Sequence, residues 1–252
     1  MTLAFSIKKQ LEHMKLDIKM TCEPNTLTAI VGPSGSGKTT LIRMLAGLET
    51  PDSGNISCNN ANWFSSSPRN VTPPQHRNAG LVFQDYTLFP HLTVEKNIRF
   101  AAVDSEQVPE LLHSFNIEHI KNKKPHSISG GERQRAALCQ TLARRPVTLL
   151  LDEPFSALDV TTRHKLQEML LELKVQLHVP IIHVTHDLEE ATLLGDSVVA
   201  IEQGKISPTW FASQLQAVHS AHNSAFYCEQ FAQISNAAVC ASTNRRKTSC
   251  RH

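Results

Sequence analysis

A glycine-rich segment at residues 32–40 constrains this chain more than any other feature of its sequence. It reads Gly-Pro-Ser-Gly-Ser-Gly-Lys-Thr-Thr, which has the spacing of a phosphate-binding loop. The apolar run 26–31 before it is typical of a buried strand, and residues 38–48 after it show helical spacing of leucines. A strand, a glycine turn and a helix in this order direct backbone N–H groups at one point. The segment therefore predicts a bound nucleoside triphosphate, unless the match arose by chance.

The residues of this loop are expected to share the work of holding phosphates. Gly35 and Gly37 allow backbone torsion angles that residues with side chains resist. We expect Lys38 to reach the β- and γ-phosphates and the hydroxyl of Thr39 to ligate Mg²⁺. The complete set of expected nucleotide contacts in the loop is Gly32, Pro33, Ser34, Gly35, Ser36, Gly37, Lys38, Thr39 and Thr40.

Two carboxylates, Asp152 and Glu153, end a second apolar run at residues 147–151. In a phosphate-loop enzyme, an aspartate in this place holds Mg²⁺ directly or through water. The glutamate beside it can polarise the attacking water as a general base. An acidic pair at an exposed strand end is also common without any catalytic role, but the phosphate loop favours the catalytic interpretation.

Strands and helices alternate along the chain, which predicts an α/β fold with a parallel sheet. Further buried strands are expected at residues 80–83 and 180–186, and an amphipathic helix spans 166–177. Residues 85–146 hold helical segments and a lysine-rich linker, so they are expected to form an inserted helical region. Residues 59–74 are rich in serine and proline and are expected to be mostly loop.

The composition fits a folded domain of ordinary size and charge. The 252 residues suit one large domain, or one domain with a small appendage, and 40% of them are hydrophobic. The net charge of +2 gives no bias toward polyanions, so no nucleic acid is expected as a partner. The six cysteines include no Cys-x-x-Cys pair, which favours free thiols in a reducing cytosol. No apolar run is long enough to predict a membrane-spanning helix.

Taken together, these motifs resemble those of ATP-binding cassette (ABC) ATPases. The resemblance covers roughly residues 1–208 and rests on 32–39, Gln84, the signature 129–134, 149–153, 156–159 and His186. It implies a P-loop NTPase fold with a RecA-like core, an antiparallel β subdomain and an inserted helical subdomain at about 85–146. Residues 209–252 are expected to form a short C-terminal tail, a helix followed by a disordered end.

The same resemblance implies a shared nucleotide site. Two cassettes would pair head to tail as a homodimer and sandwich two ATP molecules, with Ser129 of one copy facing the γ-phosphate held by Lys38 of the other. The Ser-x-x-Glu spacing from Ser129 to Glu132 independently predicts a capping box, which places Ser129 at a helix start that favours anions. The implied catalytic residues are Glu153, His186 and Gln84, the implied metal ligands are Thr39, Gln84 and Asp152, and Gly130, Gly131 and Asp159 complete the nucleotide-binding set.

One part of the family pattern is missing before the phosphate loop. ABC ATPases usually carry an aromatic residue that stacks on adenine, but no Phe, Tyr or Trp lies between Phe5 and Gly32. His13 is the only ring in this segment, and it either stacks weakly or sits in solvent. Because a lost aromatic stack is worth roughly 0.5–1.5 kcal/mol, we expect weaker nucleotide affinity.

Residues 83–94 resemble the importer branch of the family, which takes up oxyanions, sugars, polyamines, thiamine or ferric ion. By that resemblance, residues 86–92 line a groove for a membrane subunit, and exposure of Leu88, Phe89 and Leu92 would favour such a partner surface. The alternative is a locally packed loop. Residues 62–65 and 72–77 look most like molybdate importers, so molybdate is the best single guess. Thiamine, sulfate or tungstate, ferric ion and polyamine remain alternatives.

The expected function is an ATP-hydrolysing subunit that drives import of a small solute. Its expected partners are a second cassette, integral membrane permease subunits and, indirectly, an extracytoplasmic solute-binding protein. The chain is then expected to be peripheral on the cytoplasmic face of the inner membrane. The competing classes are a non-transport cassette protein of DNA repair or translation, an exporter cassette, and an ATP-binding regulator without turnover. Glu153 and His186 argue against the last of these, because both catalytic positions are filled.

Overall fold

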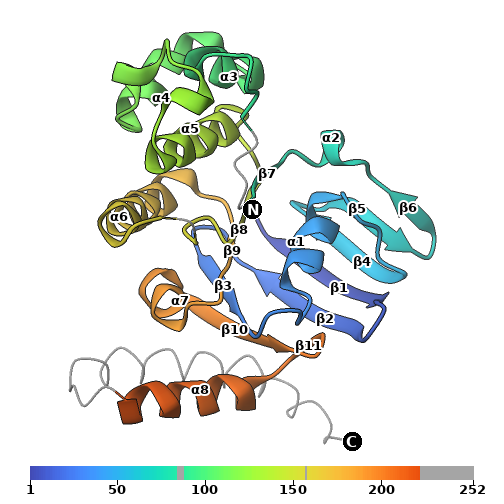
Figure 1. The fold of residues 1–252 in the computed structure, drawn as a ribbon. Coiled ribbons are helices and arrows are strands. Elements are labelled where there is room, and N and C mark those ends of the chain that lie inside the picture. The colour runs from blue at the N-terminus through green and yellow to red at the C-terminus, as the bar shows by residue number, and fades with distance from the viewer. Residues whose placement is uncertain (84–87, 157, 222–252) are drawn as a thin grey trace, which may run out of the picture.

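The computed structural model describes residues 1–83, 88–156 and 158–221. Two sheets organise them, a five-stranded sheet in the order β2-β1-β4-β5-β6 and a six-stranded sheet in the order β11-β10-β3-β9-β8-β7 (Figure 1). Helix α1 (Lys38–Ala46) packs between the two sheets, because its leucine-bearing face joins one hydrophobic cluster with residues of both. The predicted α/β fold is confirmed.

The six-stranded sheet is parallel except at one edge, where β10 and β11 form the predicted hairpin. Its central strands are buried along their whole length, as expected for a parallel sheet that is covered on both faces. The strands are β3 (Leu27–Val31), β7 (Ala79–Val82), β8 (Thr148–Asp152), β9 (Ile181–Val184), β10 (Ser197–Glu202) and β11 (Lys205–Ile206).

The five-stranded sheet is antiparallel throughout. The loop predicted at residues 59–74 is wrong, because this segment holds a strand pair that joins the sheet. Trp63 and Phe64 are each only 3% exposed, and burying these rings stabilises a segment whose serines and prolines favour turns. The strands are β1 (Leu3–Gln10), β2 (Lys15–Cys22), β4 (Ser53–Cys58), β5 (Ala61–Ser66) and β6 (Arg69–Val71).

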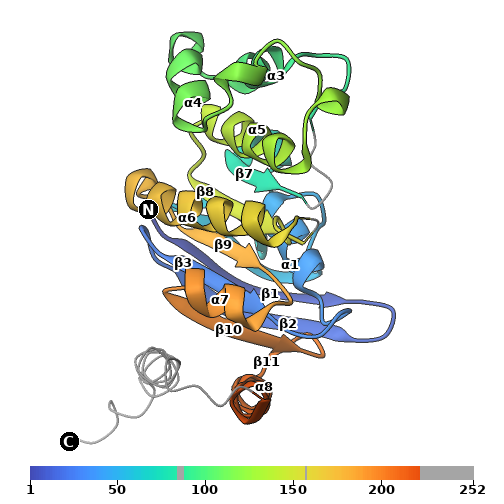
Figure 2. The same cartoon turned by 60° about the vertical axis from the view of Figure 1, so that its left-hand side comes forward.

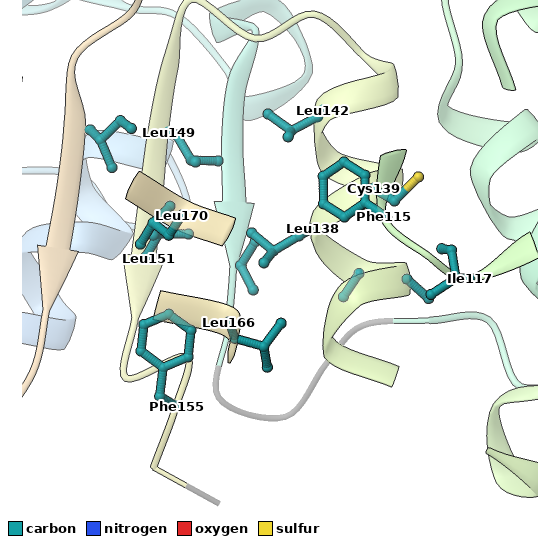
Figure 3. Close-up of a cluster of buried hydrophobic side chains, with 14 of the residues drawn as sticks. Phe115, Ile117, Leu138, Cys139, Leu142, Leu149, Leu151, Phe155, Leu166 and Leu170 are labelled. Carbon is teal, nitrogen blue, oxygen red and sulfur yellow. The ribbon is translucent and has the colours of Figure 1, made fainter. Parts of the chain in front are cut away.

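The helical region stands apart from the five-stranded sheet (Figure 2). Its helices are α3 (Val94–Ala101), α4 (Val108–Ser114) and α5 (Gly130–Ala143), as the sequence predicts. Short 3-10 helices, at Ser105–Gln107, Glu118–Ile120 and Pro125–Ser127, connect them. Figure 3 shows Phe115, Ile117, Leu138, Cys139 and Leu142 packed in one cluster with Leu149, Leu151, Phe155, Leu166 and Leu170 of the parallel-sheet unit. This shared core fixes the helical region against β8 and α6.

The remaining helices are α2 (Pro74–Arg77), α6 (Val160–Leu177), α7 (Leu188–Leu194) and α8 (Pro208–Ala221). Trp210 and Phe211 at the start of α8 pack against the main hydrophobic core. Within the described residues, no helix is both long and apolar enough to cross a bilayer. The division of the chain at residue 208 stays a prediction, and the end of the expected tail, residues 222–252, lies outside the described residues.

Arg77, at the end of α2, connects the antiparallel subdomain to the end of α1. The side chain is only 2% exposed, and its guanidinium lies 5.8 Å from the centre of the Trp63 ring. It donates to the carbonyls of Met44 (2.7 Å) and Leu45 (2.9 Å) at the carboxyl end of α1, where a cation is favoured. It also donates to the carbonyl of Thr72. The helix that follows the phosphate loop is thus anchored at its far end by one buried cation.

Candidate functional site

The phosphate-binding segment forms a tight turn between β3 and α1. Gly35 and Gly37 have φ angles of 78° and 100°, in the left-handed region that glycine enters without strain. The backbone N–H of Ser36 bonds to the carbonyl of Pro33, and α1 begins at Lys38 immediately after Gly37. The free N–H groups of the first helical turn therefore point toward the loop, as a phosphate site requires.

The ammonium of Lys38 is held inside this turn. Its Nζ donates to the carbonyls of Gly32 (2.8 Å) and Pro33 (3.0 Å), and the residue is 6% exposed. Burial lowers the pKa of Lys38, while the nearby carboxylates of Glu153 and Asp152 raise it. A buried ammonium beside a nest of backbone N–H groups is a site for an anion.

Thr39 and Asp152 bring two oxygen groups together at the start of α1. The hydroxyl of Thr39 donates to Oδ1 of Asp152 over 3.2 Å. Burial raises the pKa of Asp152, and the Thr39 hydrogen bond opposes this shift. Hard divalent cations prefer such oxygen ligands and take the rest from phosphate and water, so both residues fit a Mg²⁺ ion. Among the described residues, no cluster of three His, Cys, Asp or Glu side chains offers a metal site built from protein alone.

Glu153 and His186 meet across the ends of β8 and β9. Nδ1 of His186 lies 3.1 Å from Oε2 of Glu153, and the imidazole is 59% exposed while the carboxylate is 26% exposed. Glu153 has a φ angle of 47°, which is uncommon for a residue with a side chain and is often found at functional sites. Its N–H donates to the carbonyl of Val184, which holds the turn in place. In such a pair the carboxylate can accept a proton from a nearby water molecule, and the imidazole can hold the carboxylate in position.

Ser129 begins α5 with the predicted capping box, which is confirmed. The hydroxyl and the backbone N–H of Ser129 each donate to Oε2 of Glu132 over 2.8 Å, and the N–H of Glu132 points back to the Ser129 hydroxyl. The backbone N–H of Ser129 is the largest cause that lowers the pKa of Glu132 to about 2. Ser129 and Gly130 are exposed, so a second molecule can approach this helix start.

Asp159 caps the start of α6, and α6 begins close to the start of α5. Its carboxylate accepts from the N–H of Thr162 over 3.0 Å. Hydrogen bonding to Thr162, first to its side chain and then to its N–H, lowers the pKa of Asp159. A Cβ at Gly131 would lie only 2.3 Å from Cγ2 of Thr162. Glycine is therefore required at position 131 for α5 and α6 to approach this closely.

The family model described as ABC transporter matches residues 16–156. The chain belongs to the ABC transporter family. This cassette is 42% identical over 219 residues to the probable sulfate/thiosulfate import ATP-binding protein CysA of Chlorella vulgaris, covering 84% of this chain and 89% of that protein. It is 37% identical over 208 residues to the molybdenum import ATP-binding protein ModC of Aliivibrio fischeri, covering 81% of this chain and 57% of that protein.

Other relatives place the cassette among importers without separating their solutes. It is 44% identical over 201 residues to the Fe(3+) ions import ATP-binding protein FbpC 2 of Pectobacterium atrosepticum, covering 76% of this chain. The cassette spans 56% of that relative and 57% of the ModC protein. The importer-type ATP-binding family is thus confirmed, while the resemblance to molybdate importers in particular is not established.

Solved structures of cassettes share this fold. One is titled as the dimeric, post-hydrolysis state of the ATP-binding cassette MJ0796 bound to ADP and Pi, with a TM-score of 0.68 and 26% identity, covering 82% of this chain and 97% of that one. Another is cbiO1 from Clostridium perfringens, titled as part of the complex cbiONQ, with a TM-score of 0.71 and 25% identity, covering 86% of this chain and 93% of that one. The P-loop ABC ATPase fold with its antiparallel subdomain is therefore confirmed.

An open cleft of about 680 Å³ adjoins the phosphate loop of the cassette. The turn 11–15 between β1 and β2 lines it, together with loop residues 33–36, Gln203 and Lys205. The side chain of His13 is 87% exposed beside Glu12, whereas the half-buried Met14 reaches the glycine turn. A Cβ at Gly37 would lie 3.0 Å from Cε of Met14. Met14 therefore offers an apolar surface beside the loop, although it is not the aromatic residue that the family pattern predicts.

We expect His13→Ala to change the dissociation constant of ATP by less than about twofold, because a solvated ring contributes little stacking. The matched variant Met14→Ala is expected to weaken ATP binding by about three- to tenfold, since it removes a polarizable side chain beside the phosphate loop. Both values are measured by titration with a fluorescent ATP analogue. A several-fold loss of ATP affinity in His13→Ala would indicate that His13 stacks on adenine, and it would contradict this expectation.

The structure brings most of the predicted residues into two groups. Lys38, Thr39, Asp152, Glu153 and His186 gather at the carboxyl ends of β3, β8 and β9 and at the start of α1. Ser129, Gly130, Gly131 and Asp159 form the second group at the starts of α5 and α6. Gln84 lies outside the described residues. The individual roles of these residues stay predictions.

The loop before α3 buries two of the three apolar residues whose exposure would favour a partner surface. Leu88 is only 8% exposed and Leu92 is half-buried, so at these two residues the structure favours the alternative of a locally packed loop. Leu88 packs into the core shared by the helical region and β8, because its isobutyl group gains more from burial there than from the surface. Phe89 is 36% exposed and packs edge-on against Phe100, whose exposure is 70%. Among the described residues of this loop and α3, this aromatic pair forms an exposed apolar surface.

Asn97 of α3 holds the same loop and was not found from the sequence. The side chain is completely buried, its Oδ1 accepts from the N–H of Phe89 over 2.7 Å, and its Nδ2 donates to the carbonyls of Leu92 and Thr93. Gln140 of α5 donates to the Asn97 backbone carbonyl over 3.2 Å. Asn97 thus fixes the position of the exposed Phe89 relative to α5.

Proposed function

We propose that this cassette hydrolyses ATP to drive import of a small anion or metal ion as a subunit of a membrane transporter. The observation that carries the proposal is the contact between Glu153 and His186, 3.1 Å apart beside the phosphate loop that holds Lys38. It is supported by the import proteins of the family, which are about 40% identical to the chain. A regulator without turnover would not need a base in this place.

Each residue of the site has its own proposed role in ATP hydrolysis. Lys38 leaves the loop carbonyls to neutralise charge on the β- and γ-phosphates. Glu153 takes the proton of the attacking water, and His186 orients the carboxylate and contacts the γ-phosphate. Thr39 and Asp152 would hold Mg²⁺, which when bound neutralises negative charge on the phosphates. Gln84 remains the proposed third catalytic residue and metal ligand.

The active unit that we propose is a head-to-tail homodimer. Ser129 and Gly130 are exposed at the start of α5, and the buried Gly131 follows them, so the helix dipole there would favour the γ-phosphate held by a second copy. Asp159 lies next to this group and would share the interface. The MJ0796 cassette, which shares this fold, has been solved as a dimer, and this supports the arrangement.

Molybdate is the solute that we propose first, because residues 62–65 and 72–77 look most like molybdate importers. Sulfate or thiosulfate and ferric ion are the nearest alternatives. Relatives named for these solutes have sequence identities to the cassette of 42% and 44%, close to the 37% of the molybdenum import protein. Thiamine and polyamine are weaker alternatives. Uptake of each radiolabelled solute by a deletion strain, with and without the restored gene, tests this proposal directly. Restored sulfate uptake without restored molybdate uptake would replace the first solute.

We further propose that integral permease subunits bind the aromatic pair Phe89 and Phe100, which places the cassette on the cytoplasmic face of the inner membrane. The permease in turn contacts an extracytoplasmic solute-binding protein. Two exposed phenyl rings in edge contact, held by the buried Asn97, give a rigid apolar anchor of the kind that dominates protein interfaces.

The double substitution Phe89→Ala with Phe100→Ala is expected to lower solute uptake by about tenfold or more, because it removes both anchors. ATP binding is expected to stay unchanged. Recovery of permease from detergent-solubilised membranes, with the tagged cassette as bait, should fall in parallel. Val175→Ala, an exposed apolar residue on α6, serves as the matched control. Normal uptake by the double variant would reject this docking surface.

A further inference from the structure

We infer that His119 is a positioning residue for the signature serine: by holding the Glu132 carboxylate, it releases the hydroxyl of Ser129 for a phosphate oxygen of ATP. The inference rests on the proposed dimer, in which Ser129 of one cassette meets the γ-phosphate bound by the other. Neither the motif pattern nor the capping box assigns any role to His119.

Three side chains form a continuous chain of contacts at this point. Nε2 of His119 lies 3.0 Å from Oε1 of Glu132, and the other carboxylate oxygen, Oε2, accepts from the Ser129 hydroxyl over 2.8 Å. His119 comes from the 3-10 helix Glu118–Ile120, where the fully buried Ile120 packs into the core. This anchoring places the imidazole beside the start of α5.

The hydroxyl of Ser129 has only one proton to donate, and two acceptors compete for it. One acceptor is Oε2 of Glu132, and the other is the γ-phosphate oxygen that the proposed dimer brings to the helix start. The pKa of Glu132 is lowered to about 2, first by the N–H of Ser129, so the carboxylate is fully charged at neutral pH. A charged carboxylate is a strong acceptor and also repels an incoming phosphate.

His119 weakens both effects. When its Nε2 carries a proton it donates to Oε1, so part of the negative charge of Glu132 is satisfied away from Ser129. The carboxylate then keeps His119 and the backbone N–H of Ser129 as partners after the hydroxyl turns toward phosphate. Without His119, rotation of the Ser129 hydroxyl toward phosphate would leave Oε1 of Glu132 without that partner. Exchanging Glu132 for phosphate as the acceptor would then cost more free energy.

A purely structural surface contact would behave differently. The side chains of His119 and Glu132 are 57% and 20% exposed, and pairs of this kind contribute about 0–1 kcal/mol to stability. Loss of His119 is therefore expected to leave folding nearly unchanged. A matched pair lies in the same region, where His113 and Glu118 are 3.8 Å apart without contacting Ser129.

We expect His119→Leu to raise KM for ATP in hydrolysis by about three- to tenfold, with a smaller effect on kcat, because phosphate must displace a stronger acceptor. Binding of a fluorescent ATP analogue by dilute, monomeric cassette is expected to stay unchanged, since His119 does not line the phosphate loop. His119→Gln should restore the wild-type KM because its amide N–H can donate to Glu132. His113→Leu should match the wild type.

A double-mutant cycle decides whether His119 acts through Glu132. In a Glu132→Gln background the acceptor is neutral, so His119→Leu is expected to change KM by less than about twofold. Equal effects of His119→Leu in both backgrounds, or a wild-type KM in His119→Leu, would overturn the inference. The same assay includes wild type and Glu153→Gln: if wild type does not hydrolyse ATP, the proposed function fails and this inference fails with it. If wild type hydrolyses ATP and the cycle is additive, only this inference fails.

Discussion

Glu153→Gln is expected to lower ATP hydrolysis by about 10²- to 10⁴-fold while leaving ATP binding intact, because an amide keeps the shape of the side chain but cannot accept a proton. The amide can still bond to His186, so the ends of β8 and β9 are expected to stay together. Phosphate release under single-turnover conditions measures the chemical step, and titration with a fluorescent ATP analogue measures binding.

Glu172→Gln is the matched control for this substitution. Glu172 is exposed on α6, and its replacement also changes a carboxylate to an amide, but away from the site. It should hydrolyse ATP at the wild-type rate. The proposed dimer adds a second readout, since an enzyme that binds but does not hydrolyse ATP should accumulate as a dimer in size-exclusion chromatography with ATP. Equal hydrolysis rates in Glu153→Gln and wild type would refute the assignment of the base.

Arg77→Met is expected to lower the free energy of unfolding by about 3–5 kcal/mol, because it leaves buried carbonyl groups without a donor. Three backbone carbonyl groups accept from the guanidinium: those of Met44 and Leu45 at the end of α1, and that of Thr72. Burial lowers the pKa of Arg77 to about 10, which still leaves the side chain charged at neutral pH. Urea unfolding followed by tryptophan fluorescence measures the loss, since Trp63 lies beneath the guanidinium.

Arg69→Met is the control for Arg77→Met, because Arg69 is exposed on β6 of the same subdomain and should lose less than about 0.5 kcal/mol. Arg77→Lys is expected to fall between the two, since an ammonium keeps the charge but cannot reach all the carbonyls that a planar guanidinium joins. A loss in Arg77→Met no larger than that in Arg69→Met would show that α1 does not depend on this anchor.

The parts of the fold and site that were predicted correctly depend on local patterns. The phosphate loop is specified by a fixed spacing of glycines between a strand and a helix, and the start of α5 by a serine three residues before Glu132. The buried strand β8 is an uninterrupted apolar run that ends in Asp152. Each of these patterns acts within about ten residues, so the neighbouring sequence alone determines the local structure.

The errors and omissions depend on partners distant in the sequence. The strands β5 and β6 form because Trp63 and Phe64 have a core to enter, which the serines and prolines around them do not reveal. Leu88 is buried because the helical region folds over it. Met14 reaches the phosphate loop only after the turn 11–15 is brought beside it, and no local spacing indicates that contact.

Helix α5 links two surfaces that the proposed function assigns to different partners. Ser129 begins this helix, and Gln140 on its third turn bonds to Asn97, which in turn holds Phe89. The distance along the helix axis from Ser129 to Gln140 is about 16 Å, from a rise of 1.5 Å per residue. Because an α-helix is stiff over this length, a rotation of α5 at one end would displace Phe89 at the other. The proposed nucleotide contact and the proposed permease contact therefore lie at two ends of one rigid element, and movement at one would be transmitted to the other.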